Sequence, residues 1–234
     1  MYDRYKRKIN YLRVSVTDRC NLRCTYCMPE TGVKLINHKD ILRFHEIVEV
    51  VKYAVGIGVD KVRITGGEPL VRKGIVELIA MIAEIKGIKD FGMTTNGLLL
   101  NEFAEDLATA GLNRVNISLD TLDPKKYNQI TRVGDINTVF AGISAAKKAG
   151  LTPIKINCVI KSSSNEPDAI EVAKFCKEND LQIRYIKEMD LETGSFGIVH
   201  GGTGGNCLIC NRLRLTARGD VLPCLFSDSK YNIR

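Results

Sequence analysis

Six short runs rich in β-branched residues alternate along this chain with longer segments of helical periodicity, and this alternation restricts the possible folds more than any other feature. The predicted strands cover residues 11–17, 60–65, 90–95, 113–120, 153–160 and 181–188. Apolar residues recur three or four apart between them, which predicts helices over residues 42–55, 71–85, 101–110, 136–149 and 166–178. Repeated strand–helix units predict a parallel sheet with right-handed crossovers.

The number of these units limits how far the sheet can close. Six units are fewer than the eight of a closed TIM barrel, and the chain up to its last predicted strand is shorter than the roughly 250 residues typical of one. We therefore predict an α/β fold in which residues 1–189 form a partial (β/α)6 TIM-like barrel. After it we expect a flexible, glycine-rich connection at 190–206 and a small metal-bearing C-terminal extension at 207–234, which contains the strand-like run RLRLTARGDVLP.

The composition fits a globular protein of this kind. Of the 234 residues, 44% are hydrophobic and 26% are charged, which excludes a disordered chain, a collagen and a disulfide-rich mini-protein. No stretch approaches the roughly 18 apolar residues of a membrane span, and the basic start MYDRYKRKIN lacks the apolar run of a signal peptide. We therefore expect a soluble, cytoplasmic protein whose basic amino terminus is solvated. The net charge of +7 favours acidic partners.

Eight cysteines are the second informative feature. In a cytoplasmic chain thiols are kept reduced, so metal ligation is a better interpretation than four disulfides. Six of the cysteines form two triplets: Cys20, Cys24 and Cys27, and then Cys207, Cys210 and Cys224. Cys158 and Cys176 fall in a predicted strand and a predicted helix, and we expect them to be small buried hydrophobic residues.

Charged side chains alternate with apolar ones along the predicted strands. Arg13 and Ser15 alternate with Leu12, Val14 and Val16, so the apolar set can face the helices while the polar set faces the barrel interior. The same phase turns the following cations inward: Arg13, Lys61, Arg63, Lys155 and Arg184. A packed barrel fills this space with branched apolar side chains, and burying a cation without a counter-charge is costly.

These inward cations predict a wet barrel interior that binds an anion. The alternative is an amphipathic sheet whose polar side faces bulk water. The strand–helix pattern disfavours that alternative, because parallel sheets are seldom left open on one face.

The spacing of the first triplet, CxxxCxxC directly after the first strand, indicates iron. Such a loop lies at the carboxyl ends of the strands, where sites in this architecture form. Three thiolates can hold three irons of a 4Fe–4S cluster and leave the fourth iron open to a small ligand. A structural zinc usually takes four protein ligands, and no fourth ligand is close in the sequence. Zinc and plain buried cysteines stay as alternatives.

The second triplet is less specific when it is read without a family. Two residues separate Cys207 from Cys210, and thirteen separate Cys210 from Cys224. This spacing fits a second cluster with an open iron, and it also fits a zinc ribbon that lacks one ligand.

Two further features accompany the first triplet. An aromatic residue, Tyr26, stands just before the last cysteine, and a GGEP sequence at residues 66–69 follows the second strand. With these the chain resembles the radical S-adenosylmethionine superfamily, in which GGEP holds the methionine amino group and glycine permits close backbone approach. The resemblance implies that S-adenosylmethionine chelates the open iron, and that one electron cleaves its sulfonium to give a 5′-deoxyadenosyl radical that abstracts a substrate hydrogen. The protein then supplies placement and exclusion of water.

More motifs narrow the resemblance. The segments LRVSVTDRCNLRCTYCMP, RITGGEPL, TTNG, NISLDTLDP and IRYIKEMD, together with the second triplet, are similar to the GTP 3′,8-cyclase family over nearly the whole chain, to about residue 228. This resemblance implies the first step of molybdenum cofactor biosynthesis, a lyase reaction. A hydrogen is taken from C3′ of the GTP ribose, and the carbon radical attacks C8 of guanine. Reduction and proton donation then give (8S)-3′,8-cyclo-7,8-dihydroguanosine 5′-triphosphate.

The resemblance also implies the site. One 4Fe–4S cluster is bound by each cysteine triplet, and the second cluster binds the guanine. The residues implied to contact S-adenosylmethionine are Tyr26, Gly67, Ser118 and Met189. Those implied to bind GTP are Arg13, Lys61, Arg63, Thr94, Lys155, Arg184, Arg212 and Arg214. Guanidinium groups suit bidentate contact with phosphate oxygens, and Arg13 is the candidate catalytic residue for the late proton-donating step.

The implied partners are GTP, an electron donor of flavodoxin or ferredoxin type, and the next enzyme of molybdopterin synthesis. We expect no nucleic-acid or membrane partner, and a monomer or a homodimer.

Family members carry several dozen more residues before the second triplet and a helical tail that ends in two glycines, whereas this chain has GGTGG and ends at Arg234. A shortened natural homologue, an engineered minimal form and an inactive relative all fit this difference. Two other interpretations stay open: a radical enzyme that acts on a peptide or another nucleotide, and a non-catalytic iron–sulfur or nucleotide-binding protein.

Overall fold

A computed structural model describes residues 1–189, 197–202, 204–227 and 229–234. The six predicted strands are all present, at β1 Tyr11–Ser15, β2 Lys61–Thr65, β3 Asp90–Thr95, β4 Arg114–Ser118, β5 Lys155–Ile160 and β6 Gln182–Lys187. They pair in parallel with their neighbours in the chain. Three more strands extend the same sheet beyond β1: β7 Arg212–Leu215, β8 Asp220–Leu222 and β9 Tyr231–Asn232.

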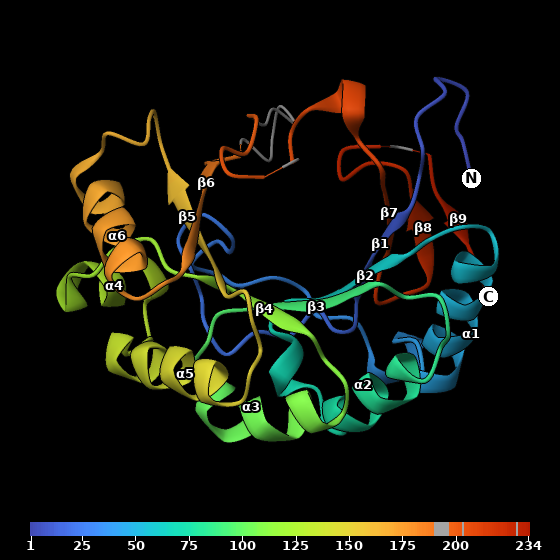
Figure 1. The fold of residues 1–234 in the computed structure, drawn as a ribbon, viewed down its shortest axis with the longest axis horizontal. Helices are drawn as coiled ribbons and strands as arrows, with labels where there is room; N and C mark the ends of the chain where they lie inside the picture. The colour runs from blue at the N-terminus through green and yellow to red at the C-terminus, as the bar shows by residue number, and fades with distance from the viewer. Residues whose placement is uncertain (190–196, 203, 228) are drawn as a thin grey trace.

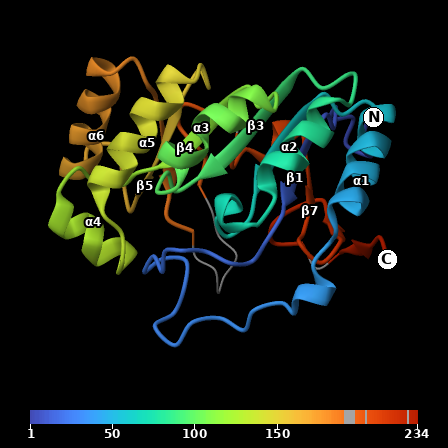
Figure 2. The ribbon, with the colours of Figure 1, turned by 90° about the horizontal axis from the view of Figure 1, so that it is seen from below.

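The helices cover one side of this sheet. They are α1 Phe44–Gly56, α2 Ile75–Ala83, α3 Leu100–Thr109, α4 Pro124–Thr131, α5 Ile136–Lys148 and α6 Pro167–Glu178. The sheet curves as an open arc with helices on its outer side (Figure 1), and seen from below α1, α2, α3, α5 and α6 lie next to one another in one layer (Figure 2). The prediction of an open, partial barrel is confirmed. No helix in the described part of the chain is long and apolar enough to cross a bilayer.

Alternation along β1 shows why the sequence folds this way. Leu12 and Val14 are at most 2% exposed and belong to the core between sheet and helices, whereas Arg13 and its polar neighbours are partly exposed on the other face. In β5, Ile156 and Cys158 are buried in the same core, and Cys176 of α6 joins them. Side chains of successive strand residues point to opposite faces, so one strand supplies both the core and the concave face.

The sequence did not predict α4. Its start carries a recognisable signal, because Asp123 accepts hydrogen bonds from the backbone N–H groups of Lys125 and Lys126, and Pro124 occupies the first helical turn. The helix is short and mostly polar, so its apolar periodicity is weak. The predicted helix 71–85 begins only at Ile75, after a 3-10 turn (η2, Pro69–Val71) and a left-handed Gly74.

The C-terminal segment continues the barrel sheet. β7 pairs in parallel with β1, and the strand-like run between Cys210 and Cys224 divides into β7 and β8, which form an antiparallel hairpin. Gly219, with φ +95°, makes the turn between them. The proposed boundaries at 190–206 and 207–234 stay predictions, and residues 190–196 and 203 of the glycine-rich connection lie outside the described residues.

Candidate functional site

Cationic side chains gather on the concave face of the sheet. Arg13, at the centre of β1, lies in register with Arg63 of β2 on one side and Arg214 of β7 on the other. On the far strands, Lys155 of β5 pairs with Asn116, and Arg184 of β6 pairs with Asn157. The strand pairing therefore arranges these basic residues in adjacent rows. Lys61 and Arg212 flank Tyr11 in the register, and Thr94 of β3 lies beside Asn116.

Burial and mutual repulsion lower the pKa values of several of these cations. Burial lowers the pKa of Arg63, and Arg114 and Arg13 lower it further. Burial also lowers the pKa of Arg184, with a contribution from Arg63. Lys155 has a pKa lowered to about 8, first by burial and then by Arg184 and Arg114. Groups that repel one another in this way favour an anion between them.

Among the residues that the structure describes, three buried guanidinium nitrogens on this face have no hydrogen-bond partner. They are Nε and Nη1 of Arg63 and Nε of Arg184. By contrast, Arg114, which sequence reasoning did not single out, is satisfied by Asp90 at 2.7 and 2.8 Å and by Asn116 at 3.2 Å. Buried donors of folded proteins are rarely left without partners. The nitrogens of Arg63 and Arg184 are therefore available to donate hydrogen bonds on this face.

The first cysteine triplet lies in the loop that leaves the carboxyl end of β1. We call residues 20–28 the cysteine loop. A turn closes its second half, since the backbone N–H groups of Cys27 and Met28 both donate to the carbonyl oxygen of Cys24 at 3.0 Å. Burial, together with the negative charges of Cys27, Asp120 and Cys20, raises the pKa of the Cys24 thiol to about 12. Three thiolates this crowded are compatible with a cationic centre that they share.

This donor set fits an iron–sulfur cluster. In the described part of the chain, no group of three or more His, Cys, Asp or Glu side chains is arranged to hold a single metal ion. The cysteines of a cluster bind different irons and need not converge on one point. The arrangement of Cys20, Cys24 and Cys27 is compatible with such ligands.

The GGEP segment packs against the start of the cysteine loop. A Cβ atom on Gly67 would lie 2.3 Å from the carbonyl oxygen of Arg19, and one on Gly66 would lie 2.8 Å from that of Thr17. Backbone hydrogen bonds of 2.8 Å join Gly67 N–H to Thr17 O and Glu68 N–H to Arg19 O. Sequence reasoning attributed these glycines to close approach of a ligand. In this structure the closest atoms belong to the protein backbone.

Glu68 connects three parts of the site, a role that sequence reasoning missed. Its carboxylate is 1% exposed and accepts hydrogen bonds from Thr95 Oγ1 and Asn96 N–H at 2.7 Å and from Leu70 N–H at 3.1 Å. Burial raises the pKa of Glu68, and these hydrogen bonds lower it. The side chain of Asn96 in turn donates to Asn21 Oδ1 at 2.8 Å. The ends of β2 and β3 are thereby fastened to the cysteine loop.

Tyr26 is directed toward the ends of β4 and β5. Its hydroxyl donates to Asp120 Oδ2 at 2.7 Å, and Asp120 Oδ1 accepts from Val159 N–H at 2.8 Å. Burial raises the pKa of Asp120. Ser118 ends β4 two residues earlier, which brings it to the same edge of the sheet. Met189, 39% exposed, follows β6.

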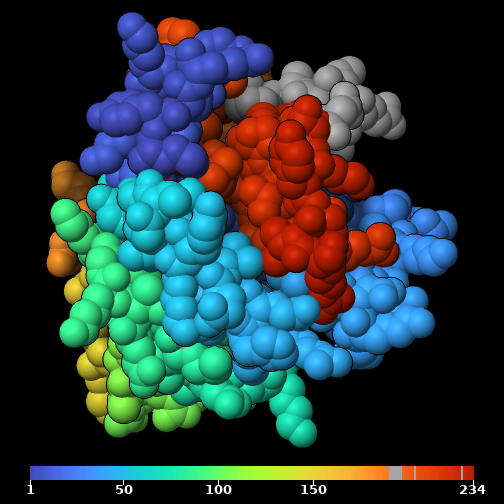
Figure 3. All heavy atoms as spheres, turned by 90° about the vertical axis from the view of Figure 1, so that its right-hand side faces the viewer, coloured from blue at the N-terminus to red at the C-terminus, as the bar shows by residue number. Residues whose placement is uncertain are grey.

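The second cysteine triplet lines a cavity of about 290 Å³. Cys207 and Cys210 precede β7, whereas Cys224 follows the antiparallel β8, so all three lie near the amino end of β7. The N-terminal segment closes the cavity from the other side, and Arg7 donates a hydrogen bond to the carbonyl oxygen of Cys207. Figure 3 shows the dark blue N-terminal and red C-terminal surfaces side by side. The side chain of Arg7 stays 28% exposed and forms an ion pair with Asp3, so Arg7 is both partly solvated and in contact with the second triplet.

The two triplets lie at opposite ends of β1. The first follows the carboxyl end of the strand, and the second is next to its amino end, where the N–H groups of Asn10 and Tyr11 donate to the carbonyl oxygen of Asn211. Because β7 runs parallel to β1, the row of Arg13, Arg63 and Arg214 lies between the two triplets. A strand of this length spans about 16 Å. At least the length of β1, lined by these cations, therefore separates the segments that carry the two triplets.

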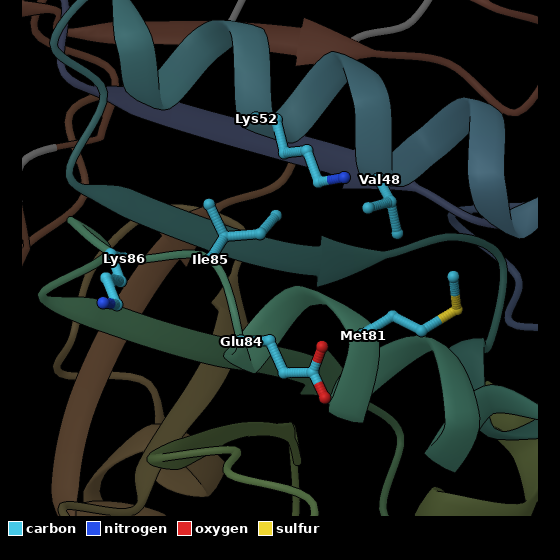
Figure 4. A pocket seen from close by; sticks show the side chains of 6 residues that line it. All are labelled: Val48, Lys52, Met81, Glu84, Ile85 and Lys86. Atoms are coloured by element: carbon cyan, nitrogen blue, oxygen red, sulfur yellow. The ribbon is translucent and has the colours of Figure 1, made fainter.

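A different cavity, of about 400 Å³, lies on the helical side of the molecule. Figure 4 shows its lining from α1 and from the end of α2 and the loop that follows: Val48, Lys52, Met81, Glu84, Ile85 and Lys86. Its residues lie away from the carboxyl ends of the strands, and neither cysteine triplet contributes to it. We assign no site there.

Comparisons with known proteins agree with this geometry. Residues 14–176 match the model of the radical SAM superfamily. The chain is 43% identical to the GTP 3′,8-cyclase of Thermodesulfovibrio yellowstonii and 41% identical to that of Moorella thermoacetica. Both matches cover 100% of this chain and 87% and 86% of the relatives. The first alignment spans 280 positions against the 234 residues of this chain, so the relative has residues without a counterpart here.

Solved structures show the same fold at lower identity. Streptococcus suis SuiB bound to S-adenosylmethionine superimposes with a TM-score of 0.72 and 21% identity, over 97% of this chain and 63% of that one. Methylornithine synthase (PylB) superimposes with a TM-score of 0.63 and 16% identity, over 88% of this chain and 64% of that one. The sequence matches are more specific than these structural ones. The chain belongs to the radical SAM superfamily and, within it, to the GTP 3′,8-cyclase family.

Proposed function

We propose that this protein binds GTP on the concave face of its sheet and converts it to (8S)-3′,8-cyclo-7,8-dihydroguanosine 5′-triphosphate, the first step of molybdenum cofactor biosynthesis. One observation carries the proposal. Buried guanidinium nitrogens of Arg63 and Arg184 lack partners within the described ranges of the chain, on a face that lies between two cysteine triplets. A polyphosphate satisfies such donors, whereas a neutral peptide segment would leave the cations without counter-charge.

Different basic residues bind different parts of the nucleotide in this proposal. Arg63 and Arg184 have free donors for triphosphate oxygens, and Lys155 supplies a point charge beside them. Arg13, Arg212 and Arg214 are nearer the second triplet, where we place the guanine and ribose, with Lys61 and Thr94 at the margins. Arg13 is our candidate to hold and donate a proton at the base, since it lies at the centre of β1, between Arg63 and Arg214.

Two 4Fe–4S clusters and S-adenosylmethionine complete the proposed site. Cys20, Cys24 and Cys27 would hold a 4Fe–4S cluster, with S-adenosylmethionine against Tyr26, Gly67, Ser118 and Met189; Cys207, Cys210 and Cys224 would hold a second cluster. When bound, the first cluster and S-adenosylmethionine supply the radical that takes the C3′ hydrogen. The chain itself binds, orients and shields the nucleotide. A flavodoxin or ferredoxin as electron donor, the next enzyme of molybdopterin synthesis as partner, a cytoplasmic location and a monomeric or homodimeric state belong to the same proposal.

Anaerobic reconstitution with iron and sulfide tests the assignment. With S-adenosylmethionine, a reductant and GTP, we expect both 5′-deoxyadenosine and the cyclised nucleotide. Cys24→Ser is expected to abolish 5′-deoxyadenosine, whereas Lys155→Ala is expected to raise the KM for GTP about tenfold, which is the effect of losing one charged contact. Lys147→Ala is the matched control, because Lys147 lies on α5, on the helical side of the sheet, and donates to the carbonyl oxygen of Asn179 at the end of α6. Cleavage of S-adenosylmethionine without any cyclised nucleotide would reject the cyclase proposal and keep the radical one.

The lowered pKa of Lys155 predicts a pH dependence. A phosphate group binds the protonated amine, so affinity for GTP is expected to fall as pH rises through about 8. The metal-free protein behaves in the opposite sense, because its Lys155 binds fewer protons than the unfolded chain between pH 8 and the usual lysine pKa, and its stability rises with pH in that window. Calorimetric titration with GTP from pH 7 to 9.5 measures the first effect. Lys155→Arg should remove it; an unchanged profile in that variant would show that Lys155 does not bind the phosphates.

A further inference from the structure

The carboxyl end of α4 contacts the cysteine loop directly. The backbone N–H of Arg23 donates to the carbonyl oxygen of Thr131 at 3.1 Å, and the N–H of Thr25 donates to that of Ile130 at 2.9 Å. These bonds use carbonyl groups that are left without partners at the end of a helix. In Figure 2 this end of α4 lies beside the dark blue loop that follows β1.

Arg132, the residue at which α4 ends, adds a side-chain contact. Its Nη1 donates to the carbonyl oxygen of Arg23 at 2.7 Å and to that of Met28 at 2.9 Å. Arg23 immediately precedes Cys24, and Met28 immediately follows Cys27. One nitrogen atom therefore joins the two ends of the CxxC segment.

The backbone at Arg132 is strained. It has φ 65°, a left-handed conformation that favours glycine at helix ends. Neighbouring contacts hold the turn: Arg132 N–H donates to Asn128 O at 2.6 Å, and Thr131 Oγ1 accepts from Gly134 N–H at 3.1 Å. An arginine in such a conformation points to a role for its side chain. The two carbonyl contacts identify that role.

We infer that Arg132 is a positioning residue for the first cysteine triplet. Its guanidinium fixes the separation of the carbonyl groups on either side of Cys24 and Cys27, and so keeps these two thiols in place to bind iron. Tyr26 anchors the loop on its other side through Asp120. The inference rests on the proposed cluster at this triplet and does not depend on GTP as the substrate.

Three variants of the full chain test this role. Arg132→Gly removes the guanidinium and also relieves the strained backbone. It therefore distinguishes the effect of losing the side-chain contacts from the effect of disturbing the turn. Arg132→Lys keeps a cationic donor. Asn128→Ala is the control at the same helix end, since the Asn128 side chain donates to Gly134 O at 3.2 Å and, within the described residues, makes no hydrogen bond to the cysteine loop.

The measurements follow the cluster and the fold separately. Each reconstituted protein is exposed anaerobically to an iron chelator, and the loss of the EPR signal that responds to S-adenosylmethionine is timed. The thermal unfolding of the metal-free protein is measured beside it. We expect Arg132→Gly to lose that signal about 10 to 100 times faster than the unmodified chain, the size of effect known for residues that orient metal ligands. Its metal-free form should melt at the same or a higher temperature.

Arg132→Lys is expected to lose the signal at an intermediate rate, and Asn128→Ala at the rate of the unmodified chain. The inference is overturned if Arg132→Gly retains the signal as long as the unmodified chain, or if Asn128→Ala loses it equally fast. A failure of the GTP assignment looks different. The unmodified chain would then keep its iron and cleave S-adenosylmethionine without forming a cyclised nucleotide.

Discussion

Replacing Arg63 with methionine is expected to weaken GTP binding and to stabilise the protein without ligand. Nε and Nη1 of Arg63 are buried and have no partner in the part of the chain that the structure describes, and Arg13 and Arg114 repel the charge. Methionine has a similar length and no charge, and replacing a buried, uncompensated charge by an apolar side chain raises the free energy of unfolding by about 1 to 4 kcal/mol. Loss of the charged contacts should cost about 2 to 3 kcal/mol of GTP binding, or roughly 30- to 150-fold in Kd.

The neighbouring Arg114→Met variant is the control. Arg114 forms two hydrogen bonds with Asp90, so its removal leaves that half-buried carboxylate without its partner. The free energy of unfolding should then fall, the reverse of the effect at Arg63. Urea unfolding of the metal-free proteins and calorimetric titration with GTP measure the two quantities. If Arg63→Met lowers stability and leaves GTP affinity unchanged, Arg63 is a structural residue and the concave face has lost its main support as a triphosphate site.

The fold and the phase of its strands were predictable because both depend on local patterns. Alternation in β1 places Leu12 and Val14 in the core and Arg13 on the concave face, and this needs no knowledge of distant residues. The same holds for the number of strand–helix units, which distinguished an open barrel from a closed one. The helix α4 was missed because its residues are mostly polar, although Asp123 and Pro124 mark its start.

The supporting contacts of the site were not predictable, since they join residues that are far apart in the chain. Arg7 contacts Cys207 across 200 positions, and Arg132 contacts Arg23 across 109. Neither arginine has a neighbour in the sequence that would distinguish it from a solvated charge. The pairing of β7 with β1 is another such case, because the sequence predicts a strand but not its partner. The motifs therefore identify the groups that do the chemistry, and the structure adds those that hold them.

Gly67→Ala is the second substitution for which we expect a large effect. It also distinguishes two reasons for a glycine at this position of GGEP. The added Cβ would lie 2.3 Å from the carbonyl oxygen and 2.6 Å from the carbonyl carbon of Arg19, closer than real contacts allow. Both atoms are backbone, so either the cysteine loop or the end of β2 must move, and the hydrogen bond from Glu68 N–H to Arg19 O would lengthen. Overpacking of this kind costs about 1 to 3 kcal/mol.

The displaced loop should also lose the first cluster, since Cys20 directly follows Arg19. Gly56→Ala is the control, because a Cβ on Gly56 at the end of α1 meets no atom within 4 Å. It should leave stability within about 1 kcal/mol of the unmodified chain. Unfolding of the metal-free protein, iron content and S-adenosylmethionine binding are measured for each. A destabilised metal-free Gly67→Ala protein supports packing against the loop as the reason for the glycine. Normal stability and iron content with loss of S-adenosylmethionine binding would instead show that the ligand, and not Arg19, requires a residue without a side chain.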